Sequence, residues 1–172
     1  MKCVSWDKCN WIDWRNQPHS EAQLQPAYQI CQWHLCRKMS RIISYLTFNG
    51  NCLDAMKFYQ KCLGGELRIQ LVGESQEAST LPDSFHNYVL QAELRNGSLE
   101  MVATDLVGDE GLKQGNTVSM MMVCKSKKEF NMLFKKLTTG GTIIQPAKKN
   151  FWGVWFGTLQ DRYGNYWLLQ CI

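Results

Sequence analysis

The side chains of this chain that could do chemistry fall into two sets. The first set consists of metal-ligand residue types near the N-terminal end: Cys3, Cys9, Cys31, His34 and Cys36. Zinc sites usually show repeated, closely spaced cysteine pairs, and this arrangement lacks them. We therefore predict no metal site among these residues.

Residues 1–38 stand apart from the rest of the chain. They hold four of the seven Trp and four of the eight Cys, and they show no sustained period of a strand or a helix. A regular pattern begins directly after Met39, which could itself be a start residue. We expect 1–38 to be a poorly ordered or non-native N-terminal extension, and 39–172 to be the folded domain.

The second set lies in 39–172 and consists of a carboxylate and an aromatic segment. Glu93, in a predicted strand, could act as a general base if its surroundings were apolar. The alternative is that it pairs with a cation such as Arg95. Residues 151–157 read FWGVWFG, and their rings suit either stacking on a flat organic ligand or packing in a core.

The overall composition is that of an ordinary globular protein. The chain has 172 residues, is 45% hydrophobic and 20% charged, and carries a net charge of +4. These values exclude a disordered chain, a fibrous rod and a small disulfide scaffold. No apolar run approaches the roughly 18–20 residues of a membrane helix, and the few surplus positive charges are spread along the chain. We expect neither a membrane nor a nucleic-acid partner.

The cysteines of the folded domain indicate its compartment. Cys52, Cys62, Cys124 and Cys171 are isolated from one another and lie in apolar stretches. Such residues are typical of reduced, buried thiols. We expect a cytoplasmic protein.

Residues 42–171 predict the same order of elements twice. Each half contains a strand, a helix closed by a glycine pair, and three more strands. They span 42–48, 52–63, 66–72, 87–95 and 98–104 in the first half, and 118–124, 127–139, 142–145, 154–160 and 165–171 in the second. The predicted helix N-caps, Asn51 and Ser126, are about 75 residues apart. We predict an α+β fold of two tandem βαβββ modules, at about 41–105 and 116–172, forming a curved eight-stranded mixed sheet around a cleft.

Strand alternation predicts which side chains face this cleft. In 87–95 the apolar side, Ala92 and Leu94 included, should pack under a helix. The predicted cleft residues are Val89, Gln91, Glu93, Met101, Ala103, Asp105, Trp152, Trp155, Phe156 and Leu168. In this hypothesis Trp152, Trp155 and Phe156 form a stacking wall. The polar anchors are Gln91, Glu93 and Asp105.

Several motifs in the same order resemble a known family. They are Tyr45-Leu46-Thr47-Phe48-Asn49-Gly50-Asn51, Leu63-Gly64-Gly65-Glu66-Leu67, Ala103-Thr104-Asp105, Phe151-Trp152-Gly153 and Asp161-Arg162-Tyr163-Gly164 with Trp167. Over about 41–171 the chain resembles the PhnB-like branch of the glyoxalase/bleomycin-resistance/dioxygenase (vicinal oxygen chelate) superfamily. The resemblance implies paired βαβββ modules, a homodimer and a small organic ligand.

The resemblance also implies where a metal would bind. Metal-dependent members hold a divalent ion with two His and two Glu on the first and last strands of the modules. Here those positions fall near Ser44, Ser119, Met101 and Leu168, which are poor ligands for such an ion. A shift of one residue would gain only Tyr45 or Glu100. We therefore predict no metal and no other cofactor.

Members of this branch often carry a methyltransferase label, which the residues do not support. A nucleotide cofactor needs a glycine-rich turn that opens a helix, whereas Gly64-Gly65 ends one. The sequence predicts a small-molecule-binding protein without the usual metal ligands. One alternative is an enzyme that uses Glu93 as general base or an atypical metal site. Another is a dimeric module whose cleft is filled by its own side chains.

Overall fold

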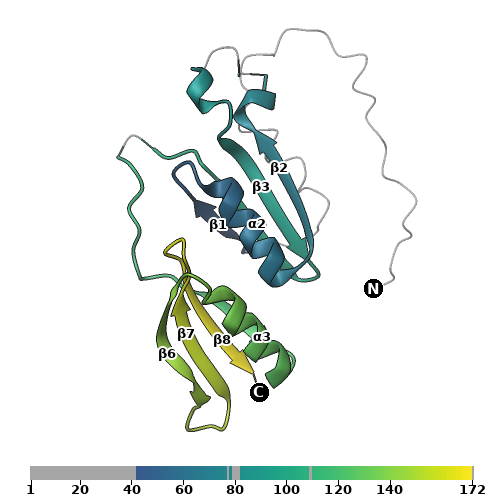
Figure 1. Ribbon diagram of the computed structural model, residues 1–172, viewed down its shortest axis with the longest axis vertical. Helices are drawn as coiled ribbons and strands as arrows, with labels where there is room; N and C mark the ends of the chain where they lie inside the picture. The colour runs from purple at the N-terminus through teal and green to yellow at the C-terminus, as the bar shows by residue number, and fades with distance from the viewer. Residues whose placement is uncertain (1–41, 77, 79–81, 109, 172) are drawn as a thin grey trace, which may run out of the picture. The chain divides into compact units, whose positions relative to one another are not determined.

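The computed structural model describes residues 42–76, 78, 82–108 and 110–171. The predictions for 1–38, including the extension and its cysteines, lie outside these residues. Residues 42–172 form one compact unit, in which the described strands make two four-stranded sheets (Figure 1). The α+β class and the tandem modules are confirmed. None of the described helices is long and apolar enough to cross a membrane.

The first module is a mixed sheet with one helix on it. Its strands are β1 (Ser44–Thr47), β2 (Glu66–Leu71), β3 (Val89–Asn96) and β4 (Leu99–Thr104), and its helices are α2 (Cys52–Leu63) and the 3-10 turns η2 (Val72–Glu74) and η4 (Asp83–Phe85). The strand order is β1-β4-β3-β2, with β1 parallel to β4 and the other pairs antiparallel. Helix α2 lies between β1 and β2 in the chain, as predicted.

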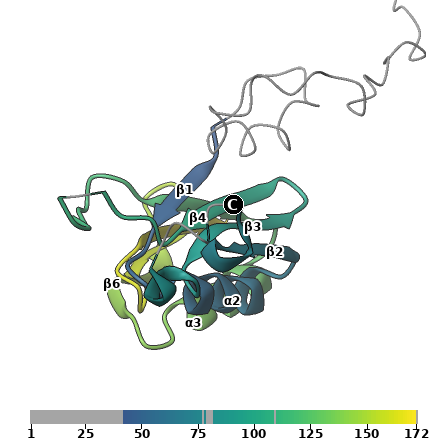
Figure 2. The same ribbon diagram turned by 90° about the horizontal axis from the view of Figure 1, so that it is seen from above.

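The second module repeats this plan. Its elements are β5 (Met120–Cys124), α3 (Lys127–Leu137), β6 (Thr142–Lys149), β7 (Trp155–Gln160) and β8 (Tyr166–Cys171). The strand order is β5-β8-β7-β6, again with the first and last strands parallel. Strand β6 runs four residues beyond its predicted end. Figure 2 shows α2 and α3 next to each other along one side of the strands, and the two helices contact each other.

Equivalent glycines close the two helices. Gly65 has a φ of 99°, and a Cβ there would lie 2.3 Å from the carbonyl oxygen of Arg95. A Cβ at Gly141 would lie equally close, 2.3 Å, to the carbonyl oxygen of Gln160. Both positions therefore exclude any larger residue, because the chain passes directly against the third strand of its own module.

The helix N-termini are capped differently. Ser126 accepts a hydrogen bond from the Glu129 N–H at 3.2 Å, which is one half of the predicted capping box, whereas the Glu129 carboxylate accepts from the Lys125 N–H instead of the Ser126 N–H. Asn51 occupies the N-cap position of α2 but makes no side-chain cap bond. The cap comes instead from Asp105, whose Oδ1 accepts from the Cys52 N–H at 2.9 Å. The end of β4 thus fixes the start of α2.

Each helix covers one face of its sheet. Ala92, Leu94, Met101 and Ala103 lie in the core beneath α2, and in the second module Leu159, Trp167, Leu169 and Cys171 lie in the core with α3. We call the opposite face of each sheet its open face. Because partners in a ladder share a face, the strand registers assign every other side chain to the covered or the open side.

Candidate functional site

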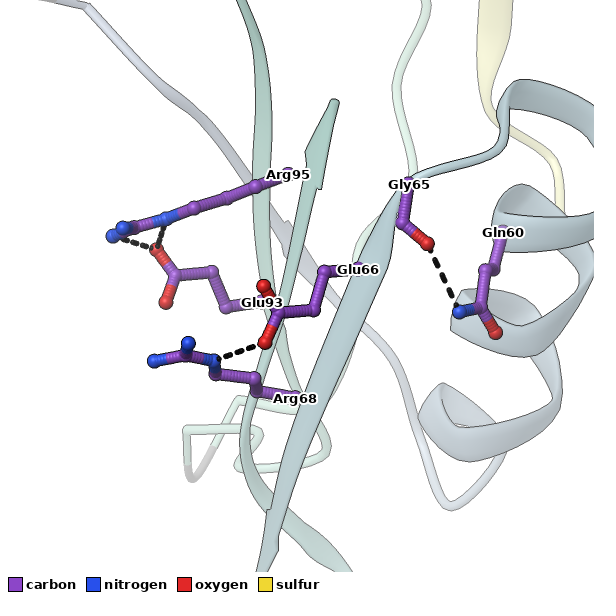
Figure 3. A network of polar contacts seen from close by, with 6 residues as sticks. All are labelled: Gln60, Gly65, Glu66, Arg68, Glu93 and Arg95. Carbon is purple, nitrogen blue, oxygen red and sulfur yellow. Dashed lines mark hydrogen bonds and ion pairs between the residues drawn. The ribbon is translucent and has the colours of Figure 1, made fainter. Parts of the chain in front are cut away.

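The open face of the first sheet carries a row of ion pairs. Figure 3 shows Glu66, Arg68, Glu93 and Arg95 on the side of β2 and β3 away from Gln60 on α2. The Arg68 Nε donates to Glu66 Oε1 at 2.9 Å. The Arg95 Nε donates to Glu93 Oε1 at 2.5 Å, and its Nη2 contacts the same oxygen. Register places Arg68 opposite Glu93 and Glu66 opposite Arg95, so charges alternate across the two strands.

The carboxylates around Arg95 are nearly buried. The side chain of Glu93 is 7% exposed and that of Glu100 is 9% exposed, whereas Arg95 is 39% exposed. The Arg95 Nη2 lies 3.6 Å from Glu100 Oε1. One guanidinium therefore serves two carboxylates, which is the cation pairing that the sequence offered as the alternative role for Glu93.

Three more predicted site residues lie on open faces. In the first sheet Gln91 pairs with Gln70, two positions along from Glu93. In the second sheet Leu168 pairs with Thr158 on one side and with Met121 on the other. Phe156 lies on the same open face of the second sheet, opposite Gln170.

The open face of the second sheet is apolar where the first is charged. Met121 is 55% exposed and Val123 is 58% exposed, and the partly buried Phe156 and Leu168 share their face through the registers of β5, β8 and β7. Apolar side chains therefore gather on one exposed face of the second sheet.

Three predicted cleft residues of the first sheet have a different orientation. Met101 is 1% exposed and lies opposite Leu94 under α2, and Ala103 pairs with the equally buried Ala92. The expected inward orientation of Met101 and Ala103 was wrong, because a two-residue hairpin loop puts these partners on one face. Val89 is also in the core, since the register shift between Gln70 and Leu71 breaks the alternation of β3.

Trp155 lies on the covered side of the second sheet. It pairs with the buried Cys171, and the Lys127 Nζ of α3 lies 3.7 Å from the centre of its ring. The next residue on that face, Gly157, is so close to α3 that a Cβ would lie 2.7 Å from the Phe134 ring. The predicted stacking wall is therefore split, with Trp155 packed against α3 and Phe156 on the open face.

Trp152 lies in the turn between β6 and β7. It is 80% exposed and packs edge-on against Phe151, which is 96% exposed, with ring centres 6.1 Å apart. Asn150 Oδ1 holds the turn by accepting from the N–H groups of Trp152 and Val154, each at 3.0 Å. The two rings form an exposed aromatic tip rather than the wall of a cavity.

Asp105, a predicted polar anchor, is buried and accepts hydrogen bonds from two backbone N–H groups. It is 3% exposed. Besides its bond to the Cys52 N–H, it accepts from the Val89 N–H through Oδ2 at 3.0 Å. Burial, reinforced by the charge of Asp105, raises the pKa of the Cys52 thiol to about 12. Cys52 is therefore a protonated core residue at neutral pH.

Sequence reasoning missed the polar centre between the two modules. Asp161 Oδ2 accepts from the Tyr59 hydroxyl at 2.7 Å and from the Trp167 Nε1–H at 2.8 Å, while Oδ1 accepts from the N–H groups of Tyr163 and Asn165. The Asn165 Nδ2 donates to the Tyr59 hydroxyl at 2.8 Å. The sequence signalled Asp161 only as a turn residue, whereas it joins α2 to the β7–β8 turn.

A small polar pocket was also missed. It has a volume of about 210 Å³ and lies where the linker between the modules meets the second sheet. It is lined by Gln114, Gly115, Asn116, Gln160, Gly164 and Tyr166. The Gln114 Nε2 donates to the Tyr163 carbonyl at 2.9 Å and so holds the linker there. Residues 114–116 read Gln-Gly-Asn, and such a run has no hydrophobic period from which a pocket could have been predicted.

The positions implied for metal ligands can now be placed. Ser44 lies opposite Met101, whose face is covered by α2, while Glu100 lies opposite Arg95 on the open face. Within the described part of the chain, His, Cys, Asp and Glu nowhere form a group of three that could hold a metal ion. The described residues at these positions therefore do not fit the metal that the family resemblance implies.

Comparison with known proteins identifies the class and then the family. The chain is 32% identical to protein PA1353 from Pseudomonas aeruginosa, with a TM-score of 0.69 over 77% of this chain and 98% of that one. It is 23% identical to the PhnB protein from Bacillus cereus, with a TM-score of 0.62 over 77% and 100%. A glyoxalase/bleomycin resistance protein/dioxygenase family enzyme from Burkholderia phytofirmans shares the fold at 13% identity and a TM-score of 0.52, over 75% and 97%.

Residues 40–170 match the family described as 3-demethylubiquinone-9 3-methyltransferase. The chain belongs to this family, and it shares its fold with the PhnB protein and with the glyoxalase/bleomycin resistance protein/dioxygenase family enzyme.

Proposed function

We propose that this protein binds a small organic ligand on the open faces of its sheets and does so without a metal or another cofactor. The observation that carries the proposal is the apolar surface of the second sheet, made by the exposed Met121 and Val123 and the partly buried Phe156 and Leu168. The ion pairs and Gln91 on the first sheet would supply polar contacts. Ligand sites combine these two features, an apolar surface and a few placed polar groups.

Native mass spectrometry of the protein from its natural source tests this proposal most directly, because it would reveal a retained ligand. The fluorescent probe 8-anilinonaphthalene-1-sulfonate offers a second test. Val123→Asp, on the open face, should weaken probe binding at least several-fold. The matched control is Met132→Asp, on α3, where the side chain is similarly exposed at 47% against 58% for Val123. Equal binding by both variants would contradict the proposal.

The second candidate function is an enzyme with Glu93 as general base. The nearly buried position of Glu93 on the open face favours it. A base of this kind must be within hydrogen-bond reach of the substrate proton, and here Glu93 already accepts from Arg95. Glu93→Gln preserves an oxygen acceptor for Arg95 and removes the base. Unchanged turnover of a substrate identified for the native protein would dismiss this function.

The methyltransferase activity named in the family description is not part of the proposal. A nucleotide-type cofactor binds at a glycine-rich turn that opens a helix. In this chain Gly64 is the C-cap of α2, and Gly140-Gly141 follow α3. Equilibrium dialysis with S-adenosylmethionine is the direct check, and binding in the micromolar range would restore the activity as a candidate.

We also propose that the protein is a cytoplasmic homodimer. The two modules carry opposite charge: residues 42–105 have four basic and eight acidic residues, whereas residues 116–171 have eight and two. The first module of one copy and the second of another are thus electrostatically complementary. Sedimentation should give twice the 19.9 kDa chain mass at low salt, with dissociation favoured as salt rises. A monomer at low salt and micromolar concentration would refute the dimer.

A further inference from the structure

Two cysteines at the end of the second sheet lie side by side. Cys124 is the last residue of β5 and Cys171 the last of β8, and the parallel ladder between these strands pairs them directly. They are 5% and 3% exposed, and both belong to the core cluster on the covered side of the sheet. Their side chains therefore leave neighbouring strands on the same face.

This placement meets the Cα separation that a disulfide requires. Neighbouring strands lie about 4.7–4.9 Å apart, and disulfides join residues whose Cα atoms are about 4.4–6.8 Å apart. The other two thiols of the described chain, Cys52 and Cys62, stand ten positions apart on α2. A helix separates such residues by roughly 15 Å along its axis, so they cannot bridge.

We propose that Cys124 and Cys171 are a disulfide-forming pair, closed by exchange with a low-molecular-weight disulfide such as oxidised glutathione. The thiolate of Cys171 attacks one sulfur of that disulfide, breaks its S–S bond and releases one glutathione thiolate. The thiolate of Cys124 then attacks Cys171 Sγ and releases the second. Two cysteines are oxidised and one disulfide is reduced to two thiols, which take up the two protons that the cysteines lost.

The surroundings make the reaction slow. Burial, followed by the charges of Glu129 and Cys171, raises the pKa of Cys124 to about 11. Cys124 is therefore a slow nucleophile at neutral pH. Exchange must begin when the ends of the two strands open locally. Such a pair responds to sustained oxidation rather than to a brief pulse of oxidant.

The product would tie β5, at the edge of the described sheet, to β8. Because β5 and β8 carry Met121, Val123 and Leu168, the crosslink would hold the apolar open face in place. It would not change the chemistry of that face, since both sulfur atoms lie on the covered side. The inference is independent of the proposed ligand function.

The test is oxidation of the full-length protein with oxidised glutathione under native conditions, followed by alkylation in denaturant and tryptic peptide mapping. Cys124 lies in the peptide 114–125 and Cys171 in the peptide that follows Arg162. The expected result is loss of the alkylated forms of both peptides in equal proportion, with one crosslinked species appearing. The midpoint of thermal unfolding should rise by up to roughly 10–15 °C, and dithiothreitol should reverse both changes.

The controls are contained in the same chain. Cys52 and Cys62 should stay separately alkylatable, and Cys124→Ala should halt the reaction at a glutathione adduct on Cys171. Glutathione adducts on the wild-type pair, crosslinks from either residue to another cysteine, or full alkylation of both after prolonged oxidation would each overturn the proposal.

Discussion

The contact between the two modules can be tested at a single hydroxyl. Tyr59 is fully buried in α2, and its hydroxyl donates to Asp161 and accepts from Asn165 of the β7–β8 turn. Tyr59→Phe removes this oxygen and keeps the ring, which packs against Trp167 with ring centres 5.8 Å apart. The substitution therefore isolates the polar contact from the apolar packing around it.

The expected cost follows from the partners that are lost. A hydrogen bond to a charged group contributes about 1.5–3 kcal/mol, and the loss also leaves the Asn165 amide without this acceptor. Asp161 retains its bonds from the Trp167 indole and from two backbone N–H groups. We expect the free energy of unfolding to fall by about 2–3 kcal/mol. For a unit of about 130 residues this lowers the unfolding midpoint by about 7–11 °C.

The pH dependence of the free energy of unfolding provides a second test with the same variant. Burial, followed by the charge of Asp161, raises the pKa of Tyr59 above its ordinary value near 10. The folded protein keeps this proton at a pH where the unfolded chain loses it. The stabilisation is therefore complete below pH 10 and declines above it, by up to about 1.4 kcal/mol per pH unit. Tyr59→Phe lacks this decline, so the stabilities of the two proteins should converge between pH 10 and 11.

Urea denaturation followed by circular dichroism at pH 7, 10 and 11 measures both effects. Tyr45→Phe is the matched control, because the side chain of Tyr45 is 60% exposed on an open face, and it should change stability by less than about 0.5 kcal/mol. The reasoning is refuted if Tyr59→Phe also stays within that limit at pH 7. It is equally refuted if the difference from the wild type does not shrink above pH 10.

Three further substitutions test the framework, each by chemical denaturation. Gly65→Ala should cost at least about 1–3 kcal/mol because its Cβ meets a backbone oxygen, whereas Gly97→Ala has open space around it and should cost less; equal costs would contradict the close approach. Asp105→Asn should destabilise by about 1–3 kcal/mol, since an amide nitrogen replaces one of two acceptor oxygens; no loss would show that its bonds are unimportant. Arg95→Leu should cost about 3–5 kcal/mol by removing the cation that pairs with the nearly buried Glu93 carboxylate, while Lys113→Leu, in an exposed ion pair, should cost under about 1 kcal/mol; similar costs would refute this.

The sequence predicted the repeat because local chemistry sets its boundaries. Glycine pairs stop both helices at the point where the chain must pass a neighbouring strand, and Gly65 and Gly141 face equivalent backbone oxygens. A position that only glycine can occupy can be recognised in a sequence without knowledge of the fold. The order of elements and most strand ends follow from such positions and from hydrophobic period.

The orientation of individual side chains was harder to predict because it depends on register. The β-bulge opposite Leu71 turns Val89 into the core. No residue type in this part of the sequence predicts that bulge. Met101 was predictable in principle. Partners across a two-residue hairpin loop share a face, so placing Leu94 beneath the helix also places Met101 there. Asp105 was missed as a cap because its partners are 53 and 16 residues away in the chain.

The two modules agree where packing constrains them and differ where it does not. Both keep the strand order, the helix position and the glycine under the third strand. Their open faces differ: the first carries alternating carboxylates and guanidinium groups, and the second carries Met121, Val123 and Leu168. The covered faces must fill a core at close packing, whereas the open faces are free to vary. Similarity of fold therefore reflects the covered faces, and the ligand that we propose has to be sought from the chemistry of the open faces.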